Sequence, residues 1–177
     1  MQTLQGENVH NNLRRIVELC RSLGLPIASH DDTTAEQVRE NVEHCMALAE
    51  FPTTLEAARE AKRNGLAVIM GAPNIVRGGS HSGNISATDL ARENLLDILS
   101  SDYMPASLLH AVFLLPELAG FSLSRALETV TSAPAKAVGL EDRGVLAPGK
   151  RADTAQVRLT NGVPVVRAVW REGRRVL

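Results

Sequence analysis

Residues 25–32 read LPIASHDD, an apolar run that ends abruptly in a histidine and two aspartates. The apolar residues 25–29 predict a buried strand, and apolar residues at helical spacing before them predict an amphipathic helix over residues 8–23. The pattern repeats downstream, with strands predicted at 46–51, 66–70 and 95–100 and helices at about 35–44, 54–65 and 87–93. Buried strands that alternate with helices predict a parallel α/β sheet.

Two segments depart from this alternation. Residues 71–84, GAPNIVRGGSHSGN, show neither the helical nor the strand period of apolar residues and so predict a long loop. A loop of this length inside a compact domain is usually functional. Two helices are expected at about 105–118 and 122–131. After Pro134 the pattern changes to short strands with a turn at Asn161-Gly162, which predicts a separate small β-element.

The composition narrows the class of protein. Hydrophobic residues make up 44% of the 177 residues, enough for a packed core, and the net charge of -1 gives no reason to expect nucleic acid as a partner. No apolar run approaches the roughly 18 residues of a membrane span, so no membrane partner is expected. Cys20 and Cys45 lack a metal-type spacing and are interpreted as reduced thiols of a cytoplasmic protein.

Polar residues follow the predicted strands at the edge where functional groups of parallel α/β folds gather. His30, Asp31 and Asp32 follow the first strand, and Asp102 follows the strand at 95–100. Imidazole nitrogen and carboxylate oxygen suit a shared divalent metal, and an aspartate there can also take a proton from water. In the alternative interpretation His30 is an ordinary polar residue, and the aspartates cap the helices that follow them.

The segment RGGSHSGN, residues 77–84, has a composition typical of anion binding. Its glycines allow backbone N–H groups to line a concavity, and Arg77 adds a guanidinium that can bind phosphate with two hydrogen bonds. It is not a nucleotide-binding P-loop, because the Gly-Lys-Ser/Thr ending is missing. Read alone, an anion-binding loop and a flexible surface loop are equally compatible with it.

Five motifs together resemble one branch of the amidohydrolase superfamily. They are ASHDDTT (28–34), AEFPTTLEAA (49–58), VIMGAPNIVRGGSHSGN (68–84), LLDILSSDYMPASLL (95–109) and DRGVLAPGKRAD (142–153). Their order and spacing are similar to those of the diphosphatase family of phosphonate breakdown in the C–P lyase pathway. That family removes pyrophosphate from α-D-ribose 1-methylphosphonate 5-triphosphate.

The resemblance implies a (β/α)8 metal-dependent hydrolase barrel with a small β-domain. Residues 1–142 would form a partial barrel, about strands six to eight, and residues 143–177 the C-terminal strands of the β-domain. His30 would then be a metal ligand, and Asp102 a metal ligand and catalytic residue that handles the proton of the attacking water. The resemblance places the substrate-binding side chains in the glycine-rich segment, at Asn74, Arg77, Ser80, His81 and Asn84.

The implied cofactor is a divalent metal, with zinc preferred over manganese or iron. The ligands that the family takes from its first, fourth and fifth strands are missing here, so the metal site in this chain is expected to be incomplete. The chain is therefore expected to be an inactive fragment by itself, completed by a missing N-terminal half or by forming a homo-oligomer. The implied substrate is a phosphorylated ribose phosphonate.

Two other interpretations remain open. In one, the chain is a non-catalytic module that oligomerises through its exposed sheet edges. In the other, it is an amidohydrolase with another substrate, such as a cyclic amide. The retained SHDD, RGGSHSGN and SSDY segments favour the diphosphatase, because a non-catalytic module has no chemical reason to keep them.

Overall fold

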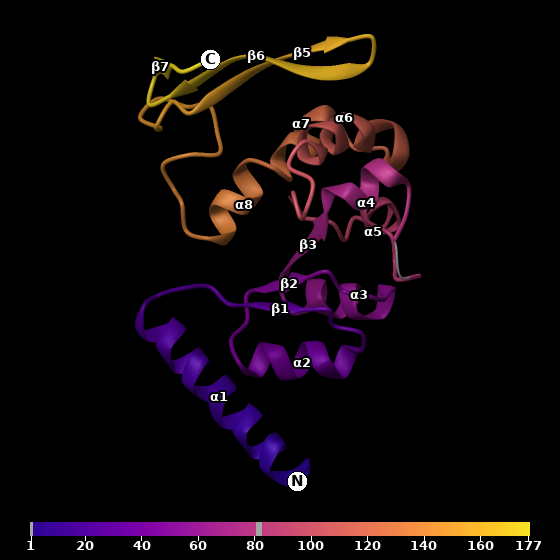
Figure 1. The fold of residues 1–177 in the computed structure, drawn as a ribbon, viewed down its shortest axis with the longest axis vertical. Coiled ribbons are helices and arrows are strands. Elements are labelled where there is room, and N and C mark those ends of the chain that lie inside the picture. Colours follow the sequence, from indigo (N-terminus) through magenta and orange to yellow (C-terminus); the bar gives the residue numbers. More distant parts are fainter. Residues whose placement is uncertain (1, 81–82) are drawn as a thin grey trace. The chain divides into compact units, whose positions relative to one another are not determined.

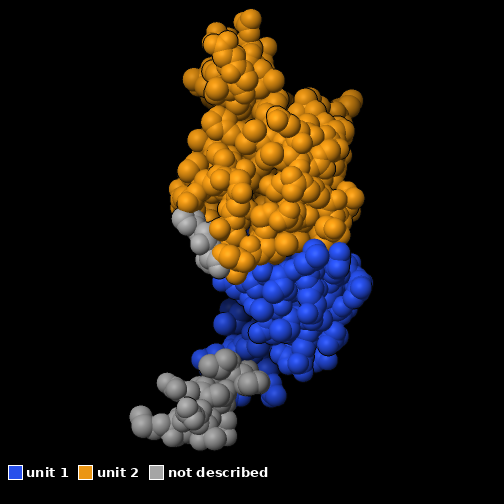
Figure 2. All heavy atoms as spheres, turned by 90° about the vertical axis from the view of Figure 1, so that its right-hand side faces the viewer, with its two compact units in different colours: residues 1–68 blue, residues 69–177 orange. Residues whose placement is uncertain are grey.

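The computed structural model describes residues 2–80 and 83–177, with side chains from residue 11 onwards. The chain divides into two compact units, residues 1–68 and 69–177 (Figure 2). Each unit combines helices with strands, and the strands of the parallel sheet follow one another in the order β1-β2-β3-β4 (Figure 1). The predicted parallel α/β arrangement is confirmed.

The first unit contains two strand–helix repeats after an N-terminal helix. Its elements are α1 (Gln2–Ser22), β1 (Ala28–His30), α2 (Ala35–Glu43), β2 (Leu48–Glu50) and α3 (Leu55–Arg63). The strands β1 and β2 are parallel, with Ser29 opposite Ala49 and His30 opposite Glu50. Val38 of α2 and three alanines of α3 are buried against the strands. The small alanines let α3 approach the sheet closely.

Threonine caps fix where the helices of this unit begin. Thr34 accepts a hydrogen bond from the Gln37 backbone, and the Gln37 side chain accepts one from the Thr34 backbone N–H, which completes a capping box. Thr54 caps α3 in the same way through the Ala57 N–H.

Replacing Thr34 by alanine tests the first cap. We expect the free energy of unfolding to fall by about 1 kcal/mol, because one orphan N–H of α2 loses its partner. Thr34→Ser keeps the hydroxyl and should retain most of the stability in a urea titration. Equal stability of the alanine and serine variants would contradict a capping role.

The second unit begins within β3 (Ala67–Gly71) and continues mainly with helices. Its elements are α4 (Ala72–Arg77), α5 (Ala87–Arg92), β4 (Ile98–Ser100), α6 (Ser107–Ala119), α7 (Leu123–Glu128) and α8 (Ser132–Ala137). Within it β3 and β4 are parallel, with Gly71 opposite Ser100. Ile75, Leu90, Leu96, Val112 and Leu115 are fully buried and form the core of this unit.

The prediction of a long loop over 71–84 is wrong for residues 72–77. Residues 72–77 form α4, which begins after Gly71, has Pro73 in its first turn and ends at Gly78 with a left-handed φ of 79°. The helix is only six residues long, too short to show a helical period, although Ile75 is buried. The helix α8 was also missed, because Pro134 lies in its first turn and was read as an end of helical structure.

The C-terminal residues form a small antiparallel sheet of β5 (Thr154–Thr160), β6 (Val163–Arg171) and β7 (Arg174–Arg175). The predicted turn at Asn161-Gly162 is confirmed: φ is 52° and 78°, as a two-residue type I′ turn requires. Glu172-Gly173 repeats this geometry and turns the chain into β7, a second hairpin that was not predicted. The sheet packs on α6 through β6, where Ala168 is buried (Figure 1).

No helix among the described residues is both long and apolar enough to cross a membrane.

Candidate functional site

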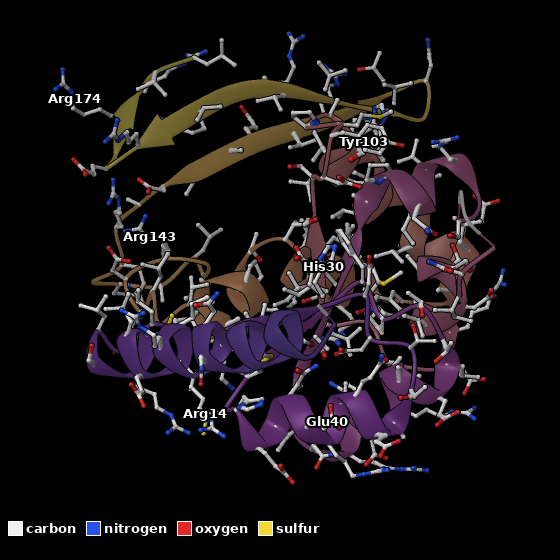
Figure 3. All side chains as sticks on the ribbon, turned by 60° about the horizontal axis from the view of Figure 1, so that its bottom comes forward. Arg14, His30, Glu40, Tyr103, Arg143 and Arg174 are labelled. Atoms are coloured by element: carbon white, nitrogen blue, oxygen red, sulfur yellow. The ribbon has the colours of Figure 1, made fainter. Side chains whose placement is uncertain are left out.

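In the first unit, His30 (labelled in Figure 3) lies at the end of β1. Glu50 at the end of β2 contacts its imidazole. His30 Nδ1 is 2.9 Å from Glu50 Oε2, and Nε2 is 3.4 Å from Asp31 Oδ2. The ring of Phe51 packs edge-on against the imidazole at a centroid distance of 5.5 Å. His30 and Asp31 also line a hollow of about 350 Å³. An exposed imidazole between two carboxylates is therefore presented at the strand ends.

Asp32, next to this pair, has a structural role. Its side chain is 5% exposed and accepts hydrogen bonds from the Ser29 hydroxyl and from Asn41 Nδ2, at 2.5 and 2.7 Å. Its backbone carbonyl accepts a hydrogen bond from the Thr53 N–H at 2.8 Å, which links the segment after β1 to the segment after β2. The alternative in which the aspartates cap the next helix is wrong for α2, because Thr34 is its cap.

The Glu50 carboxylate raises the pKa of His30 above 6.5 by hydrogen bonding, with a smaller contribution from Asp31. A raised folded-state pKa stabilises the fold below the unfolded pKa, and this contribution is lost as the pH rises through the folded value. We expect an NMR titration of the His30 ring to show a midpoint above 6.5, and Glu50→Gln to lower it. A midpoint that Glu50→Gln leaves unchanged would contradict the contact.

In the second unit, Asp102 follows β4 and lies against the end of β3. A Cβ placed on Gly71 would be 3.3 Å from Asp102 Oδ2 and 3.6 Å from Asp102 Cβ. Asp102 has a φ of 48°, in the left-handed region that aspartate and asparagine tolerate best among residues with a side chain. Asp102 does not cap the next helix, because the residue before α6 is Ala106. Asp102 is exposed, and its carboxylate lies beside Gly71, which has no side chain.

Gly71→Ala is expected to move the Asp102 carboxylate while leaving the fold intact. Gly71 has a φ of −71°, which alanine adopts without strain. The tight contact of the added methyl group is with Asp102 Oδ2 at 3.3 Å, while Pro73 Cδ at 3.6 Å is at ordinary van der Waals distance. A crystal structure of the variant should show the carboxylate displaced by a few tenths of an ångström. Gly79→Ala is the matched control, because nothing lies within 4 Å of its Cβ position. An unmoved Asp102 would disprove the contact.

The predicted substrate-binding residues are distributed around α4. Arg77 ends the helix, and its Nη1 donates to the Tyr103 hydroxyl at 2.8 Å, so it reaches the residue next to Asp102. Asn74 Oδ1 accepts the Ala87 N–H at 2.9 Å and thereby holds the start of α5. Ser80 is half-buried and Asn84 is exposed. His81 lies outside the described residues.

The side chains of His30 and Asp102 carry donor atoms of the type that divalent metals bind. An imidazole with one nitrogen held by a carboxylate is the usual form of a histidine ligand, and Asp102 adds an exposed carboxylate. Among the side chains that the structure describes, residues 11–80 and 83–177, no three histidine, cysteine, aspartate or glutamate side chains gather into a metal-holding group. His30 and Asp102 belong to different units, so their sharing of one metal stays a prediction.

A family model described as the amidohydrolase family matches residues 2–177 of this chain. The chain belongs to the amidohydrolase family. A relative named α-D-ribose 1-methylphosphonate 5-triphosphate diphosphatase, from Escherichia coli strain K12, is 49% identical over 167 residues. The match covers 93% of this chain and 44% of that relative, so this amidohydrolase chain spans less than half the relative's length.

Solved amidohydrolase structures have the same fold. Enamidase, a member of the amidohydrolase superfamily, is similar with a TM-score of 0.70 and 18% identity, over 94% of this chain and 51% of that one. The A. niger ochratoxinase is similar with a TM-score of 0.67 and 16% identity, over 92% and 44%. These likenesses confirm the predicted fold class, a portion of the amidohydrolase barrel with antiparallel strands added.

Sequence reasoning missed two residues that contact the candidate residues of this amidohydrolase chain. Glu50 is 20 positions from His30, and only the parallel register of β1 and β2 places the two side chains together. The signal that could have identified Glu50 is its place in the AEF segment (49–51). There it lies at the end of a predicted strand, as His30 does. Tyr103 was noted only as part of SSDY, and its contact with Arg77 depends on the unpredicted helix α4.

Proposed function

We propose that this chain supplies part of a diphosphatase that hydrolyses α-D-ribose 1-methylphosphonate 5-triphosphate to the 5-phosphate and pyrophosphate. The observation that carries the proposal is the 49% identity to the E. coli diphosphatase over 93% of this chain. A match of this extent spans the glycine-rich segment at 77–84 and the strand ends that carry His30 and Asp102. Identity of 49% over this range favours the same substrate.

The proposed roles follow from the donor chemistry. His30 Nε2 and the Asp102 carboxylate would hold a divalent cation, zinc in preference to manganese or iron. When bound, such a cation polarises a phosphoryl oxygen and lowers the pKa of water. Asp102 accepts the proton of the attacking water at a carboxylate oxygen. The water oxygen would bond to the α-phosphorus while the bond from that phosphorus to the oxygen shared with the β-phosphorus breaks, so that pyrophosphate leaves with that oxygen.

Arg77 and the segment after it would bind the departing phosphates. The guanidinium is exposed at the C-terminal end of α4 and is oriented by the Tyr103 hydroxyl. Ser80, His81 and Asn84 add further hydrogen-bonding groups to the same segment. Donors fixed before the reaction stabilise charge that develops on the leaving oxygens.

Further metal ligands would come from another segment or another copy of the chain, since His30 and Asp102 are two donors and a catalytic zinc usually has three. Exposed apolar side chains on α1 and directly after it support an associated chain: Ile16, Leu19 and Leu23 are 53%, 58% and 61% exposed. The cysteines Cys20 and Cys45 are free thiols, which supports the proposed cytoplasmic location.

A graft tests the proposal directly. The graft is the E. coli diphosphatase in which the stretch matching this chain is replaced by residues 1–177. We expect it to release pyrophosphate from the ribose triphosphate and to leave cyclic amides unchanged. A folded graft that hydrolyses only a cyclic amide would favour the other amidohydrolase interpretation, and one without any hydrolase activity would favour a non-catalytic module.

A further inference from the structure

Glu50 contacts the loop after β1 at two points. Its carboxylate lies 2.9 Å from His30 Nδ1, and its backbone carbonyl accepts the Asp31 N–H at 3.0 Å. Glu50 and His30 are register partners on parallel strands, so their side chains leave the sheet on the same face. One residue therefore positions both the imidazole and the adjacent aspartate.

The hydrogen bond also determines which ring nitrogen is available. A carboxylate accepts and does not donate, so neutral His30 must carry its proton on Nδ1 to keep this bond. The lone pair is then on Nε2, which lies 3.4 Å from the Asp31 carboxylate. The Phe51 ring, packed at 61° to the imidazole, restricts its rotation from the side.

We propose that Glu50 is a positioning residue that fixes the ring and tautomer of His30 so that Nε2, with the Asp31 carboxylate beside it, is offered to a divalent cation. This inference rests on the proposed function, which makes His30 a metal ligand. Outer carboxylates of this kind orient histidine ligands in metal sites, and their loss typically costs about 10- to 100-fold in metal affinity. Glu50 itself stays hydrogen-bonded to Nδ1 and is not a ligand.

The first test is the tautomer of His30 in the metal-free 177-residue chain. Ring-nitrogen NMR at about pH 9, above the usual range of histidine pKa values, separates the two neutral forms, and His30→Ala assigns the signal. We expect the Nδ1–H form in the native chain and a shift toward the Nε2–H form in Glu50→Leu. Glu50→Gln, which keeps an acceptor and the side-chain shape, should largely retain the Nδ1–H form.

The second test is zinc binding to the same chain, followed through the His30 Nε2 shift. Glu50→Leu should weaken binding roughly 10- to 100-fold, with Glu50→Gln between that variant and the native chain. Glu40→Leu is the matched control, because Glu40 is an exposed residue of α2 that lines the same hollow. It should bind zinc as the native chain does.

Three results would overturn the proposal: an Nε2–H tautomer in the native chain, a tautomer unaffected by Glu50→Leu, or equal zinc affinity in Glu50→Leu and Glu40→Leu. If Glu50→Leu fails to fold, the zinc affinity of Glu50→Gln decides: an affinity equal to that of the native chain overturns the proposal. Failure of the diphosphatase proposal is separate, because it appears as absent pyrophosphate release by the graft.

Discussion

Asp102→Asn in the graft is expected to lower kcat for pyrophosphate release by about 10²- to 10⁴-fold, the range typical for loss of a general base. Asparagine keeps the size of the side chain and tolerates the left-handed backbone, where φ is 48°. The variant therefore removes the charge and the proton acceptor with little change in folding. The measurement is the steady-state rate of pyrophosphate formation.

The control for this variant is Asp89→Asn, which neutralises another exposed aspartate of the same unit. Asp89 forms an ion pair with Arg92 on α5, and its loss should leave kcat within a few-fold of the graft. If Asp102→Asn is as active as Asp89→Asn, Asp102 is not the proton acceptor.

Arg77→Ala is expected to lower kcat/KM for the ribose triphosphate by about 10²- to 10³-fold, as for the loss of a donor that stabilises developing charge. Arg77→Lys should recover only part of this activity, because an ammonium group cannot reproduce the planar pair of hydrogen bonds. Tyr103→Phe removes the 2.8 Å contact that orients the guanidinium and should cause a smaller loss, mainly in KM.

Arg174→Ala is the control for the loss of positive charge, since Arg174 is an exposed residue of β7 in the C-terminal sheet (Figure 3). A general electrostatic effect would make the two alanine variants alike. Equal kcat/KM values for Arg77→Ala and Arg174→Ala would contradict phosphate binding by Arg77.

Local signals explain why much of the fold was predictable. Thr34 with Gln37 marks a helix start through hydrogen bonds within four residues, and Asn161-Gly162 marks a hairpin through its own backbone preference. The strands were found from their apolar runs, although β1 covers 28–30 and not 25–29, because Leu25 and Pro26 precede the pairing with β2. Such signals need no knowledge of tertiary contacts.

The candidate site was less predictable because its contacts join distant residues. His30 and Asp102 were recognised as chemically competent, but their partners Glu50 and Gly71 are set by strand register and by the close return of the chain after β4. The family resemblance implied a substrate role for Asn74, but its hydrogen bond from the Ala87 N–H was not predicted, because that bond requires α4 and α5 to be in place. Register and helix ends, rather than residue types, decide these contacts.

The central proposal is that His30 and Asp102 are both ligands of a divalent metal. The direct measurement is the divalent metal content of the purified graft compared with its His30→Ala and Asp102→Ala variants. We expect the graft to retain tightly bound metal, and each variant to contain much less while remaining folded by circular dichroism. Full metal content in both folded variants would contradict the claim, because neither side chain would then be a ligand.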